Sequence, residues 1–180
     1  MPFDETNPAM ARLAARTDTR GIRPAELPEP LRDVLRAGWV RRGSGAYVLA
    51  AYARTSGGPY EDPVHEETTV NGRGTYDLDL PAAGPARETA LLRRCIGYAR
   101  AALAARPSEA GPATAYVSLT LDGCDGPVRT GYVTFCGHHE GVAPYVRSMA
   151  ALTDGSVAVG ALERQPHPAG GAMAGNGRRR

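Results

Sequence analysis

The sequence predicts a single α+β domain, in which a five- or six-stranded antiparallel sheet packs against one long helix (about 85–105) and shorter flanking helices. Three observations lead to this prediction. The length of 180 residues corresponds to about one domain. The composition, 42% hydrophobic and 22% charged, is typical of a folded globular chain. Strand-like segments also follow one another without intervening helices, which favours antiparallel over parallel pairing.

Residues 1–27 are expected to form a flexible N-terminal arm, because they contain three prolines and only residues 9–16 can make two helical turns. The single folded domain is expected to span residues 28–162. It begins with a short amphipathic helix that has Pro30 in its first turn and ends at Gly38.

Three strands are expected to follow this helix. The run over residues 46–54 has apolar residues on both faces, which is typical of a central strand. Residues 64–70 and 75–80 mix apolar with polar side chains and are joined through Asn71-Gly72, one of the strongest short hairpin signals. This hairpin is expected to have one face in water.

The long helix over residues 85–105 is the clearest element. Pro85 suits its first turn, Glu88 complements its positive N-terminus, and Pro107 ends it. The residues of its apolar stripe recur at helical spacing and are Leu92, Cys95, Ile96, Ala99 and Leu103.

A second hairpin is predicted from residues 114–121 and 128–136, because apolar and polar side chains alternate along both runs. A short helix over residues 144–152 and a last strand over residues 156–162 are expected to follow. Residues 163–180 are expected to form a disordered basic tail.

The order of elements over residues 28–152 resembles that of the small chaperones of bacterial secretion systems and of some profilin-like modules. Those proteins place a long helix against a five-stranded antiparallel sheet. The resemblance lies in the order of elements and is supported by no sequence motif. It implies a fold, and a fold by itself does not define a function.

All 21 basic residues are arginine, and the chain contains no lysine. Together with abundant Ala, Gly and Pro, this usage is typical of a high-GC genome and indicates a bacterial source. Residues 163–180 carry a net charge of +3, which leaves −1 on residues 1–162. Since a nucleic-acid-binding domain concentrates basic residues on its folded part, no nucleic-acid partner is expected.

Three cysteines without a C-x-x-C pair fit a reducing compartment better than a disulfide framework. The start of the chain has acidic residues where a secretory signal needs basic ones. No stretch approaches the roughly 18 consecutive apolar residues of a membrane span. A cytoplasmic protein with no membrane partner is therefore expected.

The densest group of reactive side chains is Cys136, His138 and His139, at the junction of a predicted strand and a predicted helix. A thiol at a helix N-terminus has a lowered pKa, and a nearby imidazole can act as its base. The other interpretation is a buried strand-end cysteine followed by a polar loop. The sequence favours the buried cysteine, because cysteine is among the most often buried residue types.

A second candidate site is an acidic patch, formed by Glu61, Asp62, Glu66 and Glu67, that can pair with arginine on a partner. A solvated strand edge explains the same residues. The spacing of cysteines and histidines does not match a zinc site, and no phosphate-loop, dinucleotide or hydrolase motif is present. No metal and no cofactor are expected.

Two functions follow from these observations. The preferred one is a non-enzymatic module, chaperone-like or regulatory, that binds a protein or peptide. The alternative is a small cofactor-free enzyme of specialised metabolism that uses Cys136 with His138 or His139, and a small-molecule partner also stays open. A concave pocket lined by these residues and tyrosines would favour the enzyme, whereas an exposed apolar patch would favour the module.

Overall fold

The fold is described from a computed structural model, which defines residues 2–54, 57–121, 128–153 and 157–164. Its elements, with η for 3₁₀ helices, are β1 (Glu5–Thr6), α1 (Pro8–Ala15), η1 (Pro24–Glu26), α2 (Glu29–Ala37), β2 (Trp39–Arg41), β3 (Tyr47–Leu49), α3 (Pro63–Asn71), β4 (Arg73–Gly74), α4 (Pro85–Ala105), η2 (Ser108–Ala110), β5 (Ala113–Leu121), β6 (Val128–Gly137) and β7 (Val157–Arg164).

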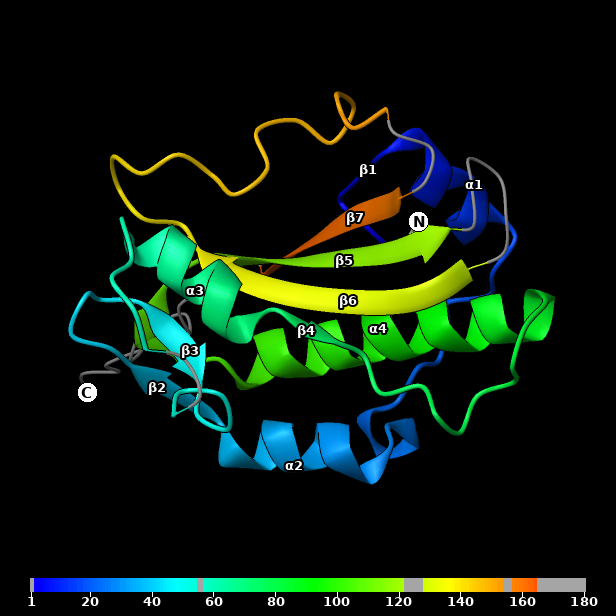
Figure 1. Cartoon of the computed structure of the whole chain (residues 1–180), viewed down its shortest axis with the longest axis horizontal. Helices are drawn as coiled ribbons and strands as arrows, with labels where there is room; N and C mark the ends of the chain where they lie inside the picture. The colour runs from blue at the N-terminus through cyan, green and yellow to red at the C-terminus, as the bar shows by residue number, and fades with distance from the viewer. Residues whose placement is uncertain (1, 55–56, 122–127, 154–156, 165–180) are drawn as a thin grey trace, which may run out of the picture.

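A five-stranded antiparallel sheet forms the centre of the molecule, in the strand order β1-β7-β5-β6-β4 (Figure 1). The middle strand β5 pairs with β6 on one side and with β7 on the other, so that Tyr116 lies opposite Thr134 and Ala161. The predicted α+β class, its antiparallel sheet and its long helix are confirmed.

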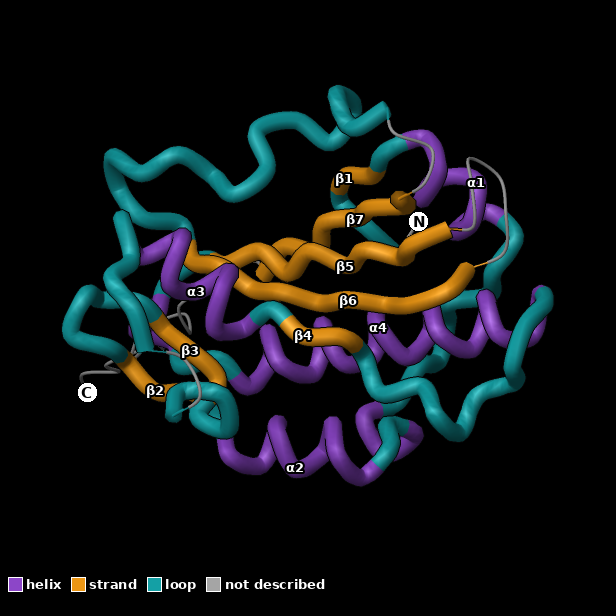
Figure 2. The backbone as a smooth tube through the Cα atoms, viewed as in Figure 1, coloured by secondary structure: helices purple, strands orange, loops and turns teal. Residues whose placement is uncertain are grey.

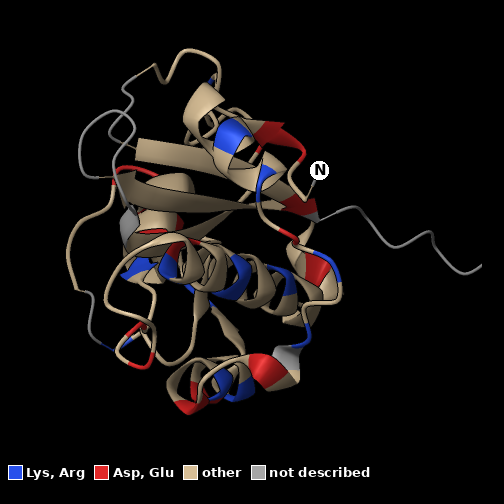
Figure 3. Cartoon of the chain, turned by 90° about the vertical axis from the view of Figure 1, so that its right-hand side faces the viewer, with Lys and Arg blue, Asp and Glu red and all other residues tan. Residues whose placement is uncertain are grey.

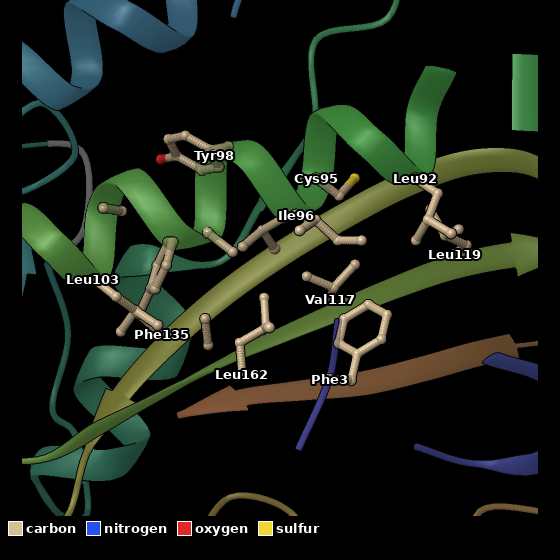
Figure 4. Close-up of a cluster of buried hydrophobic side chains, with 14 of the residues drawn as sticks. Phe3, Leu92, Cys95, Ile96, Tyr98, Leu103, Val117, Leu119, Phe135 and Leu162 are labelled. Atoms are coloured by element: carbon tan, nitrogen blue, oxygen red, sulfur yellow. The ribbon is translucent and has the colours of Figure 1, made fainter. Parts of the chain in front are cut away.

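The long helix α4 covers one face of this sheet and forms the main core with it (Figure 4). Gly131 of β6 lets the helix lie close, because a β-carbon there would come within 2.7 Å of Cys95 Sγ. The helix and the strands together bury residues that include Leu92, Cys95, Ile96, Leu103, Val117, Leu119, Phe135 and Leu162.

A separate two-stranded sheet, β2 with β3, lies beside the C-terminal half of α4. Trp39 of β2 donates its indole N–H to the carbonyl of Ala102 at 3.0 Å. The same ring packs edge-on against Phe135 of β6, with the centroids 5.6 Å apart. Trp39 therefore joins the small sheet to both the helix and the large sheet.

The helix α2 packs on the side of α4 and buries Leu31 and Val34 in the main core. Its outer surface carries both signs of charge (Figure 3). Glu29 forms ion pairs with Arg32 and Arg36 along this surface. The predicted short amphipathic helix is thus confirmed.

The opposite face of the sheet is covered only in part. The helix α3 lies at the end of β6, and the loop over residues 138–152 passes over this face (Figure 2). A second, smaller cluster of buried side chains forms beneath them and consists of Val64, Tyr116, Cys136, Met149 and Ala161.

The hairpin predicted over residues 64–80 is wrong, because its first half is the helix α3. Asp62 caps this helix by accepting a hydrogen bond from the N–H of His65 at 2.8 Å, and Pro63 occupies the first turn. Both residues are ordinary helix-start signals, but the Asn71-Gly72 pair that follows suggested a turn between strands.

Asn71 ends α3 instead of turning a hairpin. Its buried side chain accepts a hydrogen bond from the N–H of Leu49 at 2.8 Å and donates to the carbonyl of Phe135 at 3.2 Å. The predicted second strand over residues 75–80 does not form, and the short β4 just before it pairs with β6. Asn71 therefore links the two sheets, a role that its neighbours in sequence do not reveal.

Two further predicted elements are also corrected. Residues 46–54 contain only the short β3, which belongs to the two-stranded sheet and is not a central strand. Residues 144–152 form a loop and no helix. Met149 and Val146 of this loop pack in the smaller cluster, so their apolar spacing reflects burial of a loop.

The N-terminal segment, for which the sequence predicts a flexible arm, packs on the domain. Strand β1 pairs with β7, and α1 buries Met10 and Leu13 in the main core. Phe3 lies against Gly160, where a β-carbon would come within 2.7 Å of the ring. Of the predicted tail, residues 165–180 lie outside the described residues.

We expect Met10→Ala to lower the free energy of unfolding by about 2–5 kcal/mol, because Met10 is fully buried and its truncation leaves a cavity. The control is Leu78→Ala at a position that is 84% exposed, where a change below about 0.5 kcal/mol is expected. Urea denaturation measures both values. If Met10→Ala lowered the free energy of unfolding as little as Leu78→Ala, this would show that α1 does not pack on the sheet.

Candidate functional site

A buried acid–base pair lies where α3, α4 and the end of β6 meet. The side chains of Glu67 and Arg106 have no exposed surface, and Arg106 Nη2 lies 3.4 Å from Glu67 Oε1. Glu67 also accepts hydrogen bonds from the backbone N–H groups of Tyr47 and Gly137. A charged group is costly to bury without such partners, so these donors explain how a carboxylate is held at this depth.

Arg106 directly follows α4 and lies between two aromatic rings. Its guanidinium carbon is 5.2 Å from the ring centroids of both Trp39 and Tyr47, which is within cation–π distance. Nη2 also donates a hydrogen bond to the carbonyl of Ala110 at 3.4 Å. Because Trp39 and Tyr47 belong to β2 and β3, Arg106 connects the small sheet to the end of α4.

Gly137 leaves the space that this cluster needs. A β-carbon at this position would come within 2.7 Å of Arg106 Nη2, 3.1 Å of His139 Nε2 and 3.3 Å of Glu67 Oε2. His139 Nε2 itself lies 3.3 Å from Glu67 Oε2. The glycine at the end of β6 therefore allows the imidazole of His139 to reach the buried carboxylate.

Cys136 lies one residue earlier on β6, on the outer face of the sheet, and is 2% exposed. Burial raises the pKa of its thiol to about 12, and the charge of Glu67 contributes to the increase. Reactive cysteines have a pKa below the ordinary value of about 8.5. Since residues 138–153, which follow β6, form no helix that could lower the pKa, the geometry favours the buried strand-end cysteine.

An apolar cavity of about 240 Å³ lies between the end of β6 and the loop over residues 138–152. Burial raises the pKa of the Tyr116 phenol to about 12, so at neutral pH this hydroxyl keeps its proton. The Tyr116 ring packs against that of Tyr145, with centroids 5.3 Å apart. The residues that line the apolar cavity are Val64, Tyr116, Cys136, Gly137, His138, His139, Val142, Ala143 and Pro144.

A polar cavity of about 340 Å³ adjoins the same two histidines. Its lining consists of Arg41, Gly45, Tyr47, Glu109, Ala110, His138 and His139. His138 and His139 are therefore the residues that the two cavities share. His138 Nε2 lies 2.9 Å from Thr114 Oγ1, and this contact fixes the ring where the apolar and the polar cavity meet.

The four acidic residues of the expected patch do not lie together at the surface. Glu61 is exposed and Asp62 caps α3. Glu66 and Glu67 are buried, and Glu66 accepts a hydrogen bond from Arg42 Nε at 3.0 Å. The difference follows from secondary structure, since the helix α3 turns residues 66 and 67 inward where a strand edge would have exposed one of them.

Two larger hollows lie elsewhere on the molecule. One, of about 540 Å³, is between α4 and η1, and the other, of about 550 Å³, is between α2 and β4. In the first, Arg94 forms an ion pair with Asp79 and Arg23 forms one with Glu26. These charges are already paired, so they are less suited to recognise a ligand than an unpaired arginine.

Among the described residues, no three His, Cys, Asp or Glu side chains are grouped so as to hold a metal ion. Cys124, the third cysteine, lies outside the described residues. In the described part of the chain, no helix is both long and apolar enough to cross a membrane.

Sequence reasoning found Cys136, His138 and His139 but missed Arg106, Arg41 and their surroundings. Arg106 comes at the end of a helix, where an arginine is ordinarily solvated. The signal that could have identified it is the pair of aromatic residues Trp39 and Tyr47 in the small sheet, but their partner lies about 60 residues away in sequence, a separation that local patterns do not bridge.

Comparisons with protein-family models, with curated protein sequences and with solved structures find no match for this chain. Its function is therefore inferred from the chemistry of the site.

We expect Glu67→Gln to lower the free energy of unfolding by about 3–5 kcal/mol, because it removes the negative charge that faces the buried Arg106 guanidinium. Glu61→Gln, at an exposed position just before the same helix, is the matched control and should change it by less than about 0.5 kcal/mol. Chemical denaturation measures the free energy of unfolding of both variants. If Glu67→Gln left the free energy of unfolding unchanged, this would contradict burial of the pair.

The pKa values of about 12 for Cys95 and Cys136 predict a pH dependence of stability. The folded state holds these protons more tightly than the unfolded chain, whose thiols have a pKa near about 8.5. This contribution is complete below about pH 8.5 and is lost as the pH rises toward 12.

Cys136→Ala should therefore show a smaller fall in the free energy of unfolding between pH 8 and pH 11 than the unchanged protein, measured by urea denaturation. Iodoacetamide labelling at pH 8, mapped by mass spectrometry, should be at least about 100-fold slower at Cys136 in the native than in the unfolded protein. Fast labelling with a pH midpoint well below 8.5 would instead identify a reactive thiol.

Proposed function

We propose that the protein is a non-enzymatic module that binds a peptide segment of a partner protein and takes one apolar side chain into the apolar cavity. The observation that carries this proposal is the cavity itself. It combines apolar walls from Val64 and Val142 with a few polar groups, which is the usual composition of a ligand site.

Exposed aromatic side chains near the apolar cavity support a macromolecular partner. Tyr145 is 51% exposed and its ring contacts Tyr116, which lines the cavity. Tyr132 is 40% exposed and lies on the same face of β6 as Cys136, because side chains alternate along a strand. Tyrosine is enriched at protein interfaces, where its ring is buried and its hydroxyl stays hydrogen-bonded.

The alternative, a thiol enzyme, receives less support. The pocket that would favour it is present, with Cys136, His138, His139 and Tyr116 in its wall. A nucleophilic cysteine must be a thiolate, however, and a pKa of about 12 keeps Cys136 protonated at neutral pH. Cys136 is better explained as part of the apolar wall.

The proposal extends to where the module works. Arginine without lysine and three cysteines without a C-x-x-C pair support a bacterial protein of a high-GC genome that acts in the cytoplasm. A chaperone-like or regulatory role of the module, exerted by binding a peptide segment of its partner, fits the same setting.

The test is a titration of the ¹⁵N-labelled protein, followed by NMR, with two peptides blocked at both ends, acetyl-Gly-Leu-Gly-amide and acetyl-Gly-Gly-Gly-amide. The leucine peptide should shift the amide signals of Tyr116, Cys136 and Val142, because its side chain enters the apolar cavity. The glycine peptide should leave these signals unchanged at the same concentration.

Ala143→Trp supplies the variant, since Ala143 lines the cavity and is exposed, so a large ring can fill the space without unfolding the core. Ala150→Trp, at an exposed position in the same loop, is its control. Shifts that are lost in Ala143→Trp and kept in Ala150→Trp support the proposal. No shifts, or equal shifts with both peptides, would overturn it.

A further inference from the structure

The two cavities meet at His138 and His139, which line both of them. One side of this meeting point is apolar, with Val64 and Val142, and the other is polar. A ligand that occupies both cavities must therefore carry an apolar group for one and a polar or charged group for the other.

Arg41 supplies an uncommitted positive charge to the polar cavity. It is exposed at the end of β2, opposite Tyr47 in the small sheet, and lines the cavity. Among the described residues its guanidinium has no ion-pair partner, whereas Arg94 in the larger hollow is paired with Asp79. A guanidinium binds a carboxylate through two parallel hydrogen bonds, a geometry that a point charge does not offer.

Glu109 is the acidic side chain among the described residues that line this cavity. Its Oε2 accepts a hydrogen bond from Ser108 Oγ at 3.4 Å. Its negative charge opposes that of an anionic ligand, so removing it should strengthen the binding of such a ligand. Substitutions of Arg41 and of Glu109 are thus expected to change the affinity for an anionic ligand in opposite directions.

We propose that this composite site binds the C-terminal residue of a peptide, with its carboxylate at Arg41 and its apolar side chain in the apolar cavity. The inference rests on the proposed function, since it uses the same cavity and names which part of a peptide enters it. In a C-terminal residue, carboxylate and side chain are attached to one Cα atom, so that one residue offers an apolar and an anionic group to the two adjoining cavities.

The peptide residues that precede the bound C-terminal residue have a surface on which to lie. Tyr145 is 51% exposed, packs on Tyr116 and belongs to the loop that borders the apolar cavity. Capture of a terminal carboxylate is an established mode of peptide recognition. A free amino acid would reach both cavities but would not use this aromatic surface.

The experiment compares acetyl-Gly-Gly-Leu with a free carboxylate, the same peptide as its C-terminal amide, acetyl-Gly-Gly-Gly acid, and acetyl-leucine. Affinities are measured by NMR titration at low salt, because salt screens an exposed charge pair. The free-acid leucine peptide should bind at least about tenfold tighter than its amide. It should also bind tighter than the glycine acid and acetyl-leucine.

Arg41→Gln should bring the acid-to-amide ratio close to one, and Glu109→Gln should raise it. Arg36→Gln, a change of the same kind on α2, should leave the ratio unaltered. Thermal unfolding of each variant verifies that the fold is intact.

Each other outcome contradicts a particular claim. Equal binding of acid and amide would overturn the role of Arg41 and leave the proposed function standing. Acetyl-leucine binding as tightly as the tripeptide would identify a small carboxylate as the ligand and overturn recognition of a peptide. Failure of both leucine peptides to bind would overturn the proposed function as well.

Discussion

The contact between Glu67 and Arg106 sets how four elements meet. Its two side chains come from α3 and from the end of α4, and further partners come from β3 and β6. Burying two charges costs several kcal/mol of desolvation, which their attraction repays only when the geometry is good. Each of these elements supplies a partner to the pair, so displacing one of them would leave a buried charge with fewer partners.

That arrangement places the candidate site on the less covered face of the sheet. One face carries α4 and the main core. On the other face, α3 and the loop over residues 138–152 cover β5, β6 and β7 incompletely. The cavities lie at the edge of this partial cover, beside the fixed pair, so the site is formed by a loop but positioned by rigid elements.

The sequence predicted the elements whose determinants are local. The helix α4 has its start signal, its apolar stripe and its end within one continuous stretch, and it was predicted with the observed bounds. The helix α3 was missed although Asp62 and Pro63 are good start signals, because the Asn71-Gly72 pair has a strong local preference for a turn. The tertiary hydrogen bonds of Asn71 outweigh that preference.

The candidate site was predicted in part for the same reason. Cys136, His138 and His139 are adjacent in sequence and could be recognised as a group. The pairing of Glu67 with Arg106 joins residues 39 positions apart, whereas the local run of acidic residues predicts a surface patch. Phe3 and Gly160, which pack against each other, are even farther apart in sequence. Local patterns therefore predict an arm and do not indicate this contact.

The pairing of β1 with β7 has a consequence for how the chain folds. Glu5 lies opposite Ala161, and the side chain of Asn7 binds the carbonyl of Val157 and the N–H of Val159. During synthesis the N-terminal segment must therefore wait until nearly the whole domain has left the ribosome before it can take its native place. Contacts between such distant residues slow folding, and until they form, β7 has an open edge that a second nascent chain can pair with.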